Sequence, residues 1–375
     1  MIKTLKFLPW LYCLLIGLSL TIVMGLPALP LTIAGVDSIG EATFSTGLKF
    51  QNTELGGLSG ITYDASKQVY YAISDDRSQK AAARFYTLKI DLSSGKLKPE
   101  RVKFVGVTTL LDENGKPFAP LSLDSEGIAF SRDSVFVSSE GDTERKISPF
   151  IKAFSLTGKL LKTLPIPDKF LPNAKGDVGV RNNLALESLA VTPDRKYLFT
   201  ATENALVQDG DVPTSQTGTP CRILRYNLVS NQPEKEFVYI TEPLVGEPNP
   251  PGSFITNGLV DLVAIADDRL LSLERAFSQA NGVTIRIFDV SLEKADNIQA
   301  IDSLKNRLSQ VSPAQKRLLL DLKELNLRLD NLEGLTLGPL LADGRRSLLL
   351  VSDNNFNPLQ FTQILGFGIN FQQTP

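Results

Sequence analysis

The chain contains no histidine and only two cysteines, and these absences exclude several kinds of active site. Without histidine there is no Ser-His-Asp or Cys-His catalytic group and no histidine-ligated zinc centre. Cys13 and Cys221 are too few for a disulfide framework or a cysteine-based metal cluster. We expect Cys221 to be an unpaired thiol packed in the core. Catalysis, if present, must depend on carboxylates, on hydroxyls with another base, or on a bound cation.

The chain also lacks an excess of charge of either sign. Its 39 Lys and Arg residues against 41 Asp and Glu residues give a formal net charge of −2. Nothing in this balance points to nucleic acid as a partner. With 375 residues, 42% of them hydrophobic, the chain can bury a large core. No linker rich in Gly and Ser divides it, so we expect one domain after the N-terminus, acting as a monomer.

Residues 1–36 have the pattern of a secretory signal. A short basic start with Lys3 and Lys6 precedes an uncharged stretch containing LLIGLSLTIVMGL. Small residues and prolines then follow, which favours cleavage and export to the periplasm or the medium. The alternative is an uncleaved membrane anchor, because the apolar run approaches the length that spans a bilayer. Pro27 and Pro30 interrupt that run and favour the signal.

A repeated unit organises the rest of the chain, and residues 332–358 show it most clearly. Here Glu333 precedes the strand-like LTLGP, a turn ADGR follows, and the apolar strand SLLLV leads to Asp353. Two antiparallel strands joined by a tight turn place the start of the first beside the end of the second. Glu333 and Asp353 are therefore expected at one end of one hairpin.

Four similar hairpins occur upstream. Their spacing of 61 to 74 residues is typical of a solenoid or a propeller built from strands. The hairpins pair Ser59 with Asp75, Glu126 with Glu140, Glu187 with Glu203, and Asp261 with Glu274.

Each of the first four repeats offers four strand candidates, and the fifth lacks its fourth strand. The segment at residues 42–50, which precedes the first hairpin, can supply that strand and close a ring. We therefore predict an all-β fold, a five-bladed β-propeller over residues 42–370, with six blades as the alternative. An inserted segment in blade four has five apolar residues at helical spacing and predicts a helix on the outside or rim of that blade. Those residues are Ile298, Ile301, Leu304, Leu308 and Val311.

Propeller geometry predicts a site, because the hairpin ends of all blades meet around one channel mouth. Carboxylates so close together repel one another and either take up protons or require a cation. Hard oxygen ligands favour Ca²⁺, with Mg²⁺ or Mn²⁺ as the less favoured ions. Single acids could instead cap strand ends. The predicted metal ligands are Glu126, Glu187, Glu333, Asp353, Asp75, Glu274 and Asn354, and the predicted general bases are Glu140 and Glu203.

Basic residues recur close to these acids. Arg77 and Arg275 follow second strands, and a loop carries Lys175 and Arg181. Guanidinium groups bind phosphate through two hydrogen bonds, so these four residues could hold a small anionic ester. For Arg77 and Arg275 we favour the alternative, in which each neutralises an acid across a blade junction.

Three serines and two long loops lie near the predicted site. Ser59, Ser125 and Ser188 adjoin the acids but have no lysine beside them in the sequence, so we expect turn residues and no nucleophile among them. The long loops at residues 205–222 and 241–258 are rich in Pro, Gly and Thr. They could cover the channel mouth or be ordinary surface loops.

The motifs GLSGITYD, DSEGIAF, LESLAVTPD, LLSLERAF and NLEGLTLGP with LLLVSDNNFNP resemble, in this order, the phytase-like family. The resemblance extends from about Leu55 to Phe367. It implies an exported propeller with phosphoesterase or esterase activity, by metal-assisted hydrolysis in which acids hold Ca²⁺ and a remaining glutamate takes a proton. The alternatives are a Ca²⁺-stabilised propeller that binds a ligand or an envelope protein without catalysis, and a lactonase-type hydrolase.

Overall fold

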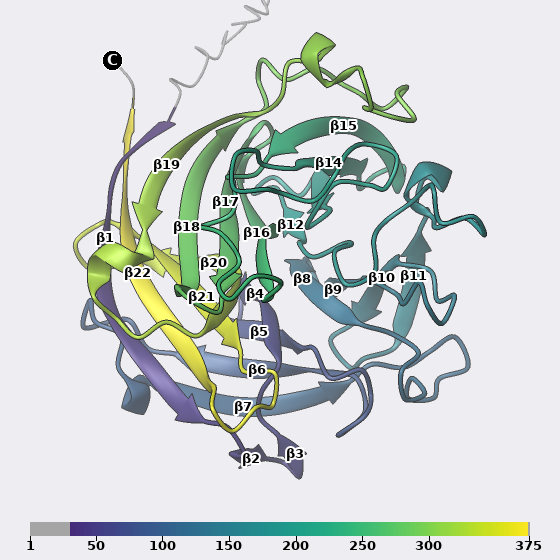
Figure 1. Ribbon diagram of the computed structural model, residues 1–375. Helices are drawn as coiled ribbons and strands as arrows, with labels where there is room; N and C mark the ends of the chain where they lie inside the picture. Colours follow the sequence, from purple (N-terminus) through teal and green to yellow (C-terminus); the bar gives the residue numbers. More distant parts are fainter. Residues whose placement is uncertain (1–30, 374–375) are drawn as a thin grey trace, which may run out of the picture.

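Five four-stranded antiparallel sheets are arranged radially around a centre, as Figure 1 shows. The computed structural model describes residues 31–373. Each innermost strand contacts the innermost strands of both neighbouring sheets, so the ring is closed. The predicted five-bladed β-propeller is confirmed, and the alternative of six blades is wrong.

The first three blades follow one another along the chain, each running from the innermost to the outermost strand. Blade one contains β4 (Leu58–Asp64), β5 (Val69–Ser74), β6 (Arg84–Ile90) and β7 (Val102–Thr109). Blade two contains β8 (Ser125–Ser131), β9 (Ser134–Ser139), β10 (Phe150–Ser155) and β11 (Leu160–Leu164). Blade three contains β12 (Ala190–Val191), β13 (Tyr197–Ala201), β14 (Pro220–Asn227) and β15 (Gln232–Ile240).

The last two blades complete the ring. Blade four contains β16 (Ile255–Ala266), β17 (Arg269–Ser278), β18 (Gly282–Ser291) and β19 (Gln315–Asp321). Blade five contains β20 (Asn331–Leu340), β21 (Arg346–Asp353), β22 (Phe361–Gln373) and, as its outermost strand, β1 (Leu31–Ser45). Smaller elements are the hairpin of β2 (Lys49–Phe50) and β3 (Thr53–Glu54), and the 3-10 turns η1 (Pro99–Arg101), η2 (Asp168–Phe170), η3 (Leu308–Gln310) and η4 (Leu322–Leu325).

Strand β1 closes the ring as the sequence predicted, by pairing antiparallel with β22 from Leu31↔Gln373 to Ser45↔Phe361. The strand begins earlier than expected. Its first residues fall within the range 1–36 that was assigned to the leader, and the expected domain start at residue 42 lies inside it. The predicted signal or anchor at residues 1–30 lies outside the described residues.

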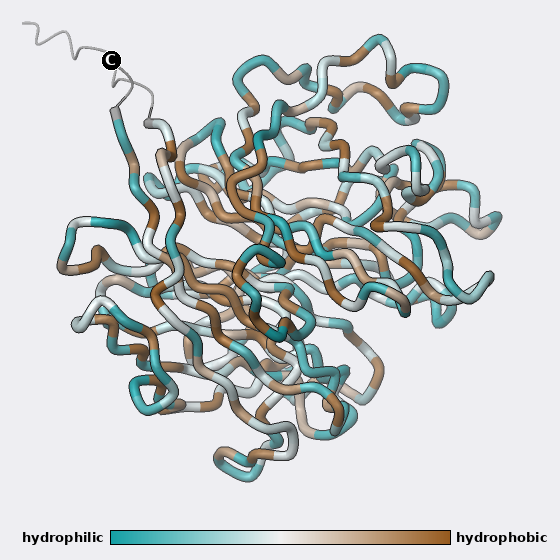
Figure 2. The backbone as a smooth tube through the Cα atoms, turned by 60° about the vertical axis from the view of Figure 1, so that its left-hand side comes forward, coloured by the Kyte–Doolittle hydropathy of each residue, from teal (hydrophilic) through white to brown (hydrophobic). Residues whose placement is uncertain are grey.

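The apolar runs of the sequence are explained by sheets that pack on both faces. Strand β5, VYYAIS, is buried at every position, because neighbouring blades cover it from both sides. Five clusters of buried apolar residues each fill the space between two adjacent blades. Figure 2 shows the hydrophobic segments along the strands and the hydrophilic ones in the loops. Cys221 is buried in the cluster between blades three and four, as predicted.

The innermost strands approach one another closely at the centre, and glycine permits this. A Cβ atom on Gly127 would lie 2.8 Å from the Glu187 carbonyl oxygen and 2.8 Å from the Leu189 nitrogen. Gly60 and Gly334 meet neighbouring backbone in the same way. The ring centre is therefore tightly packed.

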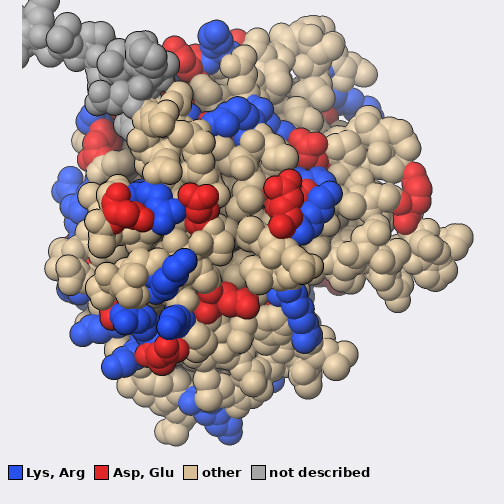
Figure 3. Space-filling view, turned by 90° about the vertical axis from the view of Figure 1, so that its left-hand side faces the viewer, with Lys and Arg blue, Asp and Glu red and all other residues tan. Residues whose placement is uncertain are grey.

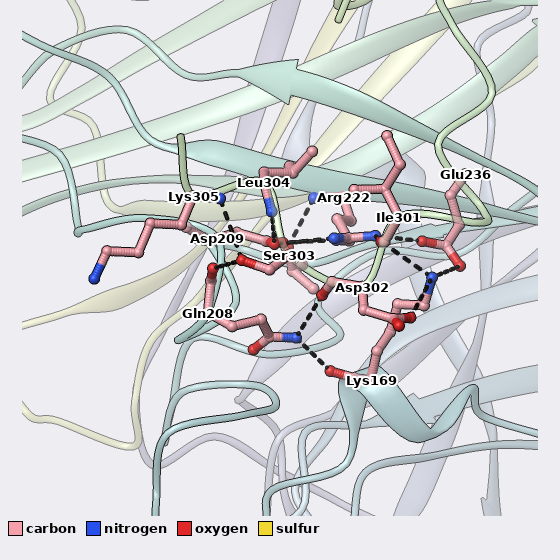
Figure 4. A network of polar contacts seen from close by, with 12 residues as sticks. Lys169, Gln208, Asp209, Arg222, Glu236, Ile301, Asp302, Ser303, Leu304 and Lys305 are labelled. Carbon is pink, nitrogen blue, oxygen red and sulfur yellow. Dashed lines mark hydrogen bonds and ion pairs between the residues drawn. The ribbon is translucent and has the colours of Figure 1, made fainter. Parts of the chain in front are cut away.

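The inserted segment of blade four does not form the predicted helix, and η3 is its one helical turn. Its apolar residues pack instead against Val238, and partly against Ile240, of β15 in blade three. Backbone groups that a helix would use internally bind a buried ionic network (Figure 4). The Ile301 carbonyl accepts a hydrogen bond from Arg222 Nη1 at 2.9 Å, and the Leu304 amide donates to Asp209 Oδ1 at 2.9 Å. Tertiary contacts override the helical spacing here.

That network is centred on Arg222, whose side chain is fully buried. Its Nε and Nη2 donate to the two oxygens of Asp209 at 2.6 and 2.9 Å, and Nη1 donates to Glu236 Oε2 at 2.7 Å. Lys169 Nζ lies 3.5 Å from the other oxygen of Glu236. The network ties the insert to blade three.

The outer surface carries mixed charges on the side of β1 and β19, where Figure 3 shows Lys and Arg interspersed with Asp and Glu. Within residues 31–373, no helix has the length and apolar character needed to cross a membrane.

Candidate active site

An irregularity in the pairing of the innermost strand sets one residue of each blade apart, and in blades two, three and five this residue is a glutamate that lines a cavity. Strands β4, β8, β16 and β20 each carry such an irregularity against the next strand, and in blade three the bridge Leu186↔Thr202 precedes the short β12. A bulge leaves one residue out of the ladder and turns its side chain. The five equivalent residues are Ser59, Glu126, Glu187, Val260 and Glu333.

A second residue of each blade lies at the end of the second strand. It directly follows the residue that pairs with the innermost strand just before the bulge. The pairs Leu58↔Ser74, Ser125↔Ser139, Leu186↔Thr202, Leu259↔Glu274 and Leu332↔Ser352 are equivalent. The next residues along the chain are Asp75, Glu140, Glu203, Arg275 and Asp353. Blade four therefore presents Val260 and Arg275 where the other blades present mostly acids.

Eight of these ten positions line one cavity of about 860 Å³, and Ser59 and Val260 do not. Of the eight acids that the sequence predicted as metal ligands or general bases, seven belong to this lining. Those seven are Asp75, Glu126, Glu140, Glu187, Glu203, Glu333 and Asp353, and Asp330, which the sequence did not indicate, lines the cavity as well. Most of them are buried, Glu203 and Asp353 with 2% exposure each. The cavity thus concentrates negative charge where water is scarce.

Three acids stand close enough to share one cation. Asp75, Asp124 and Glu126 each offer an oxygen, and these oxygens lie within 4.8 Å of one another. Two oxygens bound to one calcium ion lie at most about 5 Å apart, since Ca–O distances are about 2.3–2.6 Å. Asp124 was missed by the sequence reasoning. Its signal was the extra acid in LDSEG, two residues before Glu126.

Unpartnered oxygens support the same interpretation. Asp75 Oδ1 and Asn204 Oδ1 are buried and have no hydrogen-bond partner among the described residues. Buried polar atoms are normally paired, so each is a candidate for an external ligand. Both residues line the cavity, and with hard oxygens as the donor set they fit a cation such as Ca²⁺.

Burial dominates the acid–base properties of the cavity. It raises the pKa of Asp75 and Glu126 well above the ordinary range, and neighbouring negative charges add to the shift. Burial also raises the pKa of Glu140 to about 8, with the charge of Glu203 acting in the same direction. Without a cation, several of these carboxyls keep a proton near neutral pH.

Glu203 differs because a guanidinium lies beside it. Burial raises its pKa to about 7, and the charge of Arg275 opposes this rise. Arg275 Nη2 lies 3.5 Å from Glu203 Oε1 and 3.2 Å from Glu333 Oε1. Arg275 thus neutralises acids of blades three and five, which is the alternative favoured from the sequence.

The predicted basic residues do not gather around the acids. Arg77 joins blades one and two, with Nε 3.3 Å from Asp124 Oδ1 and Nη2 2.8 Å from Asp142 Oδ2. Arg181 donates to the carbonyl oxygens of Ala205 and Gly210, and Lys175 is exposed. Arg181 and Lys175 line a neighbouring cavity of about 710 Å³. Of the four, only Arg275 lines the acidic cavity among the described residues.

Two predicted metal ligands lie elsewhere. Glu274 is one residue out of register with the other acids and points away from the cavity. Its oxygens accept hydrogen bonds from the Tyr239 hydroxyl at 2.7 Å and the Lys316 ammonium at 2.6 Å, among others. Asn354 accepts from the amides of Gly57 and Phe356, both at 3.1 Å, and so braces a turn. Its neighbour Asn355 lines the cavity instead.

The three serines beside the acids bond to backbone. Ser59 donates to the Glu126 carbonyl at 3.0 Å, Ser125 donates to the Ser74 carbonyl at 3.0 Å, and Ser188 accepts from the Ala201 amide at 3.0 Å. Each therefore has a structural partner. The expectation of turn residues was wrong, because Ser59 lies in β4, Ser125 begins β8, and Ser188 lies in the segment that leads into β12.

Both long loops reach the cavity. Val212 and Pro213 from the first and Leu244 and Phe254 from the second are part of its lining. The loops therefore bring apolar side chains to the cavity.

Comparison with known families agrees with this architecture. The family described as "Phytase-like: Esterase-like activity of phytase" matches residues 53–356, most of the chain. The chain belongs to the phytase-like family. The resemblance seen in the hairpin motifs is thereby confirmed, and the family match includes every acid of the cavity.

Other similarities are more distant. A protein of Arthroderma benhamiae described as "Uncharacterized secreted protein" is 27% identical over 143 residues, which are 32% of this chain and 27% of that protein. The chain therefore matches only about a quarter of that relative's length. Among solved structures, the Pseudomonas aeruginosa periplasmic gluconolactonase PpgL has a TM-score of 0.33 at 12% identity, covering 85% of this chain and 89% of that one. Hydrazine synthase of Kuenenia stuttgartiensis has a TM-score of 0.33 at 10% identity, covering 87% and 99%.

Proposed function

We propose that the chain is an exported, cation-dependent hydrolase of carboxylic or phosphate esters that acts as a monomer without a nucleic-acid partner. The observation that carries the proposal is the cluster of Asp75, Asp124 and Glu126 with its unpartnered Asp75 oxygen. Membership of a family described by esterase-like activity supports ester hydrolysis. The secretory pattern of residues 1–36 and a relative described as secreted support export.

The cation site is proposed on the side of blades one and two. Asp75, Asp124 and Glu126 would hold the ion. A bound Ca²⁺ would supply a Lewis acid for the ester oxygen. Arg77 Nε lies 3.3 Å from Asp124 Oδ1 and would help to fix the position of that carboxylate.

Glu203 is the better candidate for the general base. A base works best when its pKa lies near the working pH, and Glu203 has a pKa of about 7 whereas Glu140 has one of about 8. Arg275 also holds Glu203 in one orientation, while Glu140 accepts a hydrogen bond from the Ala185 amide. Glu203 would take the proton of the attacking water, and Glu140 would hold one.

The test is an activity assay on the purified protein with matched variants. Substrates are p-nitrophenyl acetate, p-nitrophenyl phosphate, phytate and a lactone, each with Ca²⁺ and with EDTA. We expect Ca²⁺-dependent turnover of an ester, a fall in kcat of about 100-fold in Glu203→Gln, and loss of the Ca²⁺ response in Asp75→Asn. The control is Glu100→Gln, which removes an exposed acid outside the cavity.

The other outcomes are distinct. Ca²⁺-dependent thermal stabilisation without turnover of any substrate would overturn the hydrolase and support a binding module. Turnover of the lactone alone would move the activity to lactonase chemistry. Activity that persists unchanged in EDTA and in Asp75→Asn would contradict the cation site.

A further inference from the structure

The acidic cavity offers almost no positive charge to a substrate. Two basic residues line it, Arg275 and Arg328. Arg275 is paired with Glu203 and Glu333, and Arg328 donates to the Leu359 carbonyl at 3.1 Å while its guanidinium lies 4.8 Å from the centre of the Phe361 ring. The protein's own side chains thus give a polyanion no matching cation, and the one ion proposed at Asp75, Asp124 and Glu126 would balance only part of its charge. The lining disfavours polyanions.

Apolar side chains also line the same cavity, and several of them are exposed. We call Val212, Leu244, Phe254, Phe277 and Leu359 the apolar rim, and all five line the cavity. Phe254 is 68% exposed and Leu359 is 81% exposed. The rings of Phe254 and Phe277 lie 6.1 Å apart, so the first extends the surface of the second. Exposed apolar side chains that gather at a pocket mark a binding surface.

From these two observations we propose the class of substrate, an inference that rests on the proposed ester hydrolysis. The substrate is an amphiphilic ester that carries at most one negative charge and has an apolar alkyl group. Its ester would face the acidic floor and its alkyl group would lie on the apolar rim. Inositol polyphosphates are excluded as the preferred substrate, in spite of the family description.

The first test is a chain-length series with Ca²⁺ present. We expect kcat/KM for p-nitrophenyl esters to rise from acetate through butyrate to octanoate, by about two- to fourfold for each methylene that the rim buries. p-Nitrophenyl phosphate and phytate serve as charged comparisons, and they also distinguish carboxylic from phosphate esters. Equal kcat/KM along the series, or phytate as the best substrate, would overturn the inference.

Matched variants locate the effect. Phe254→Ser should lower kcat/KM for the octanoate ester at least about tenfold more than for the acetate ester, since only the longer chain reaches the rim. Val229→Ser is the control, because Val229 is 86% exposed in the turn between β14 and β15 and is not part of the cavity lining. An equal loss for both esters in Phe254→Ser would contradict the assignment.

A binding measurement separates failure of this inference from failure of the proposed function. Octanoate and acetate are titrated into the Ca²⁺-loaded protein by calorimetry. Tighter binding of octanoate that Phe254→Ser abolishes, without turnover of any ester, would remove the hydrolase and retain the apolar rim as the ligand site. Hydrolysis of the acetate ester with no preference for octanoate in either measurement would retain the hydrolase and overturn the rim.

Discussion

In the absence of divalent cations, the free energy of unfolding should fall as the pH rises from about 5 to 8.5. Glu203 has a pKa of about 7 in the folded protein against an ordinary value of 4.5, and burial is the main cause. Between these two values the folded protein keeps a proton that the unfolded chain has already lost. Stability falls with pH wherever the folded state binds more protons than the unfolded state. The contribution is fully present below about pH 4.5 and is lost as the pH passes the folded value.

The size of the effect follows from the shift. One pKa unit corresponds to about 1.4 kcal/mol, so Glu203 alone changes the free energy of unfolding by on the order of 3 kcal/mol across this range. Glu140, whose pKa burial raises to about 8, acts in the same direction. We therefore expect a fall of at least about 3 kcal/mol between pH 5 and pH 8.5 in EDTA.

Urea denaturation followed by circular dichroism is the suitable assay, at several pH values in EDTA and again in Ca²⁺. Tryptophan fluorescence is unsuitable because the single tryptophan, Trp10, lies in the predicted leader, outside the described residues. Ca²⁺ should raise the free energy of unfolding by about 2.7 kcal/mol at 100 times its Kd, and most at high pH, because it competes with the protons of Asp75, Asp124 and Glu126. Glu203→Gln should reduce the slope in EDTA. A free energy of unfolding that stays constant or rises with pH in EDTA would refute the reasoning.

Three further predictions concern the frame around the cavity. Arg222→Met should lower the free energy of unfolding by about 3–5 kcal/mol in urea denaturation, because Asp209 and Glu236 lose their buried counter-charge. A loss below about 1 kcal/mol would contradict this. Gly127→Ala should cost about 1–3 kcal/mol because its Cβ meets the backbone of the next blade, whereas Gly35→Ala, with nothing within 4 Å, should change thermal stability little; equal effects would argue against the tight centre. Arg275→Met should tighten Ca²⁺ binding by about tenfold or more in calorimetry, because it removes a positive charge from the cavity, and unchanged affinity would place the ion elsewhere.

The sequence was sufficient for the blades and for most of the acids, because both follow from strand periodicity. An apolar run such as SLLLV between turn residues can only be a buried strand in a protein of repeated hairpins, and the acids at its ends inherit their position from the hairpin. Seven acids from residue 75 to residue 353 were therefore placed in one cavity without coordinates. Ring closure by β1 followed in the same way from the missing strand of the fifth blade.

For blade four, the prediction from the sequence was wrong by one residue. The sequence LSLERAF offers Glu274 as the match to the other acids, but the pairing Leu259↔Glu274 is equivalent to Leu58↔Ser74. Since side chains alternate along a strand, a shift of one residue moves Glu274 out of the cavity and Arg275 into it. The bulge that sets the register has no distinct sequence signal.

The helix predicted for the inserted segment was wrong for a different reason. Its apolar spacing predicted burial correctly, and Ile298 and Leu304 are fully buried. The spacing could not reveal that Arg222 and Asp209, far away in the sequence, bind the backbone of the segment. Long-range hydrogen bonds of this kind decide between a helix and an irregular loop, and no local pattern contains them.

Because blade four departs from the repeat, the charge differs between the two sides of the cavity. Five identical hairpins would surround the mouth with acids on every side, and a cation would have no preferred place. Val260 and Arg275 remove the acids of one blade and add a positive charge there, next to the base candidate Glu203. The uncompensated carboxylates then remain at blades one and two, where Asp75 and Glu126 stand together. A cation on that side would be separated from the base, so an ester between them could meet the ion at one end and the attacking water at the other.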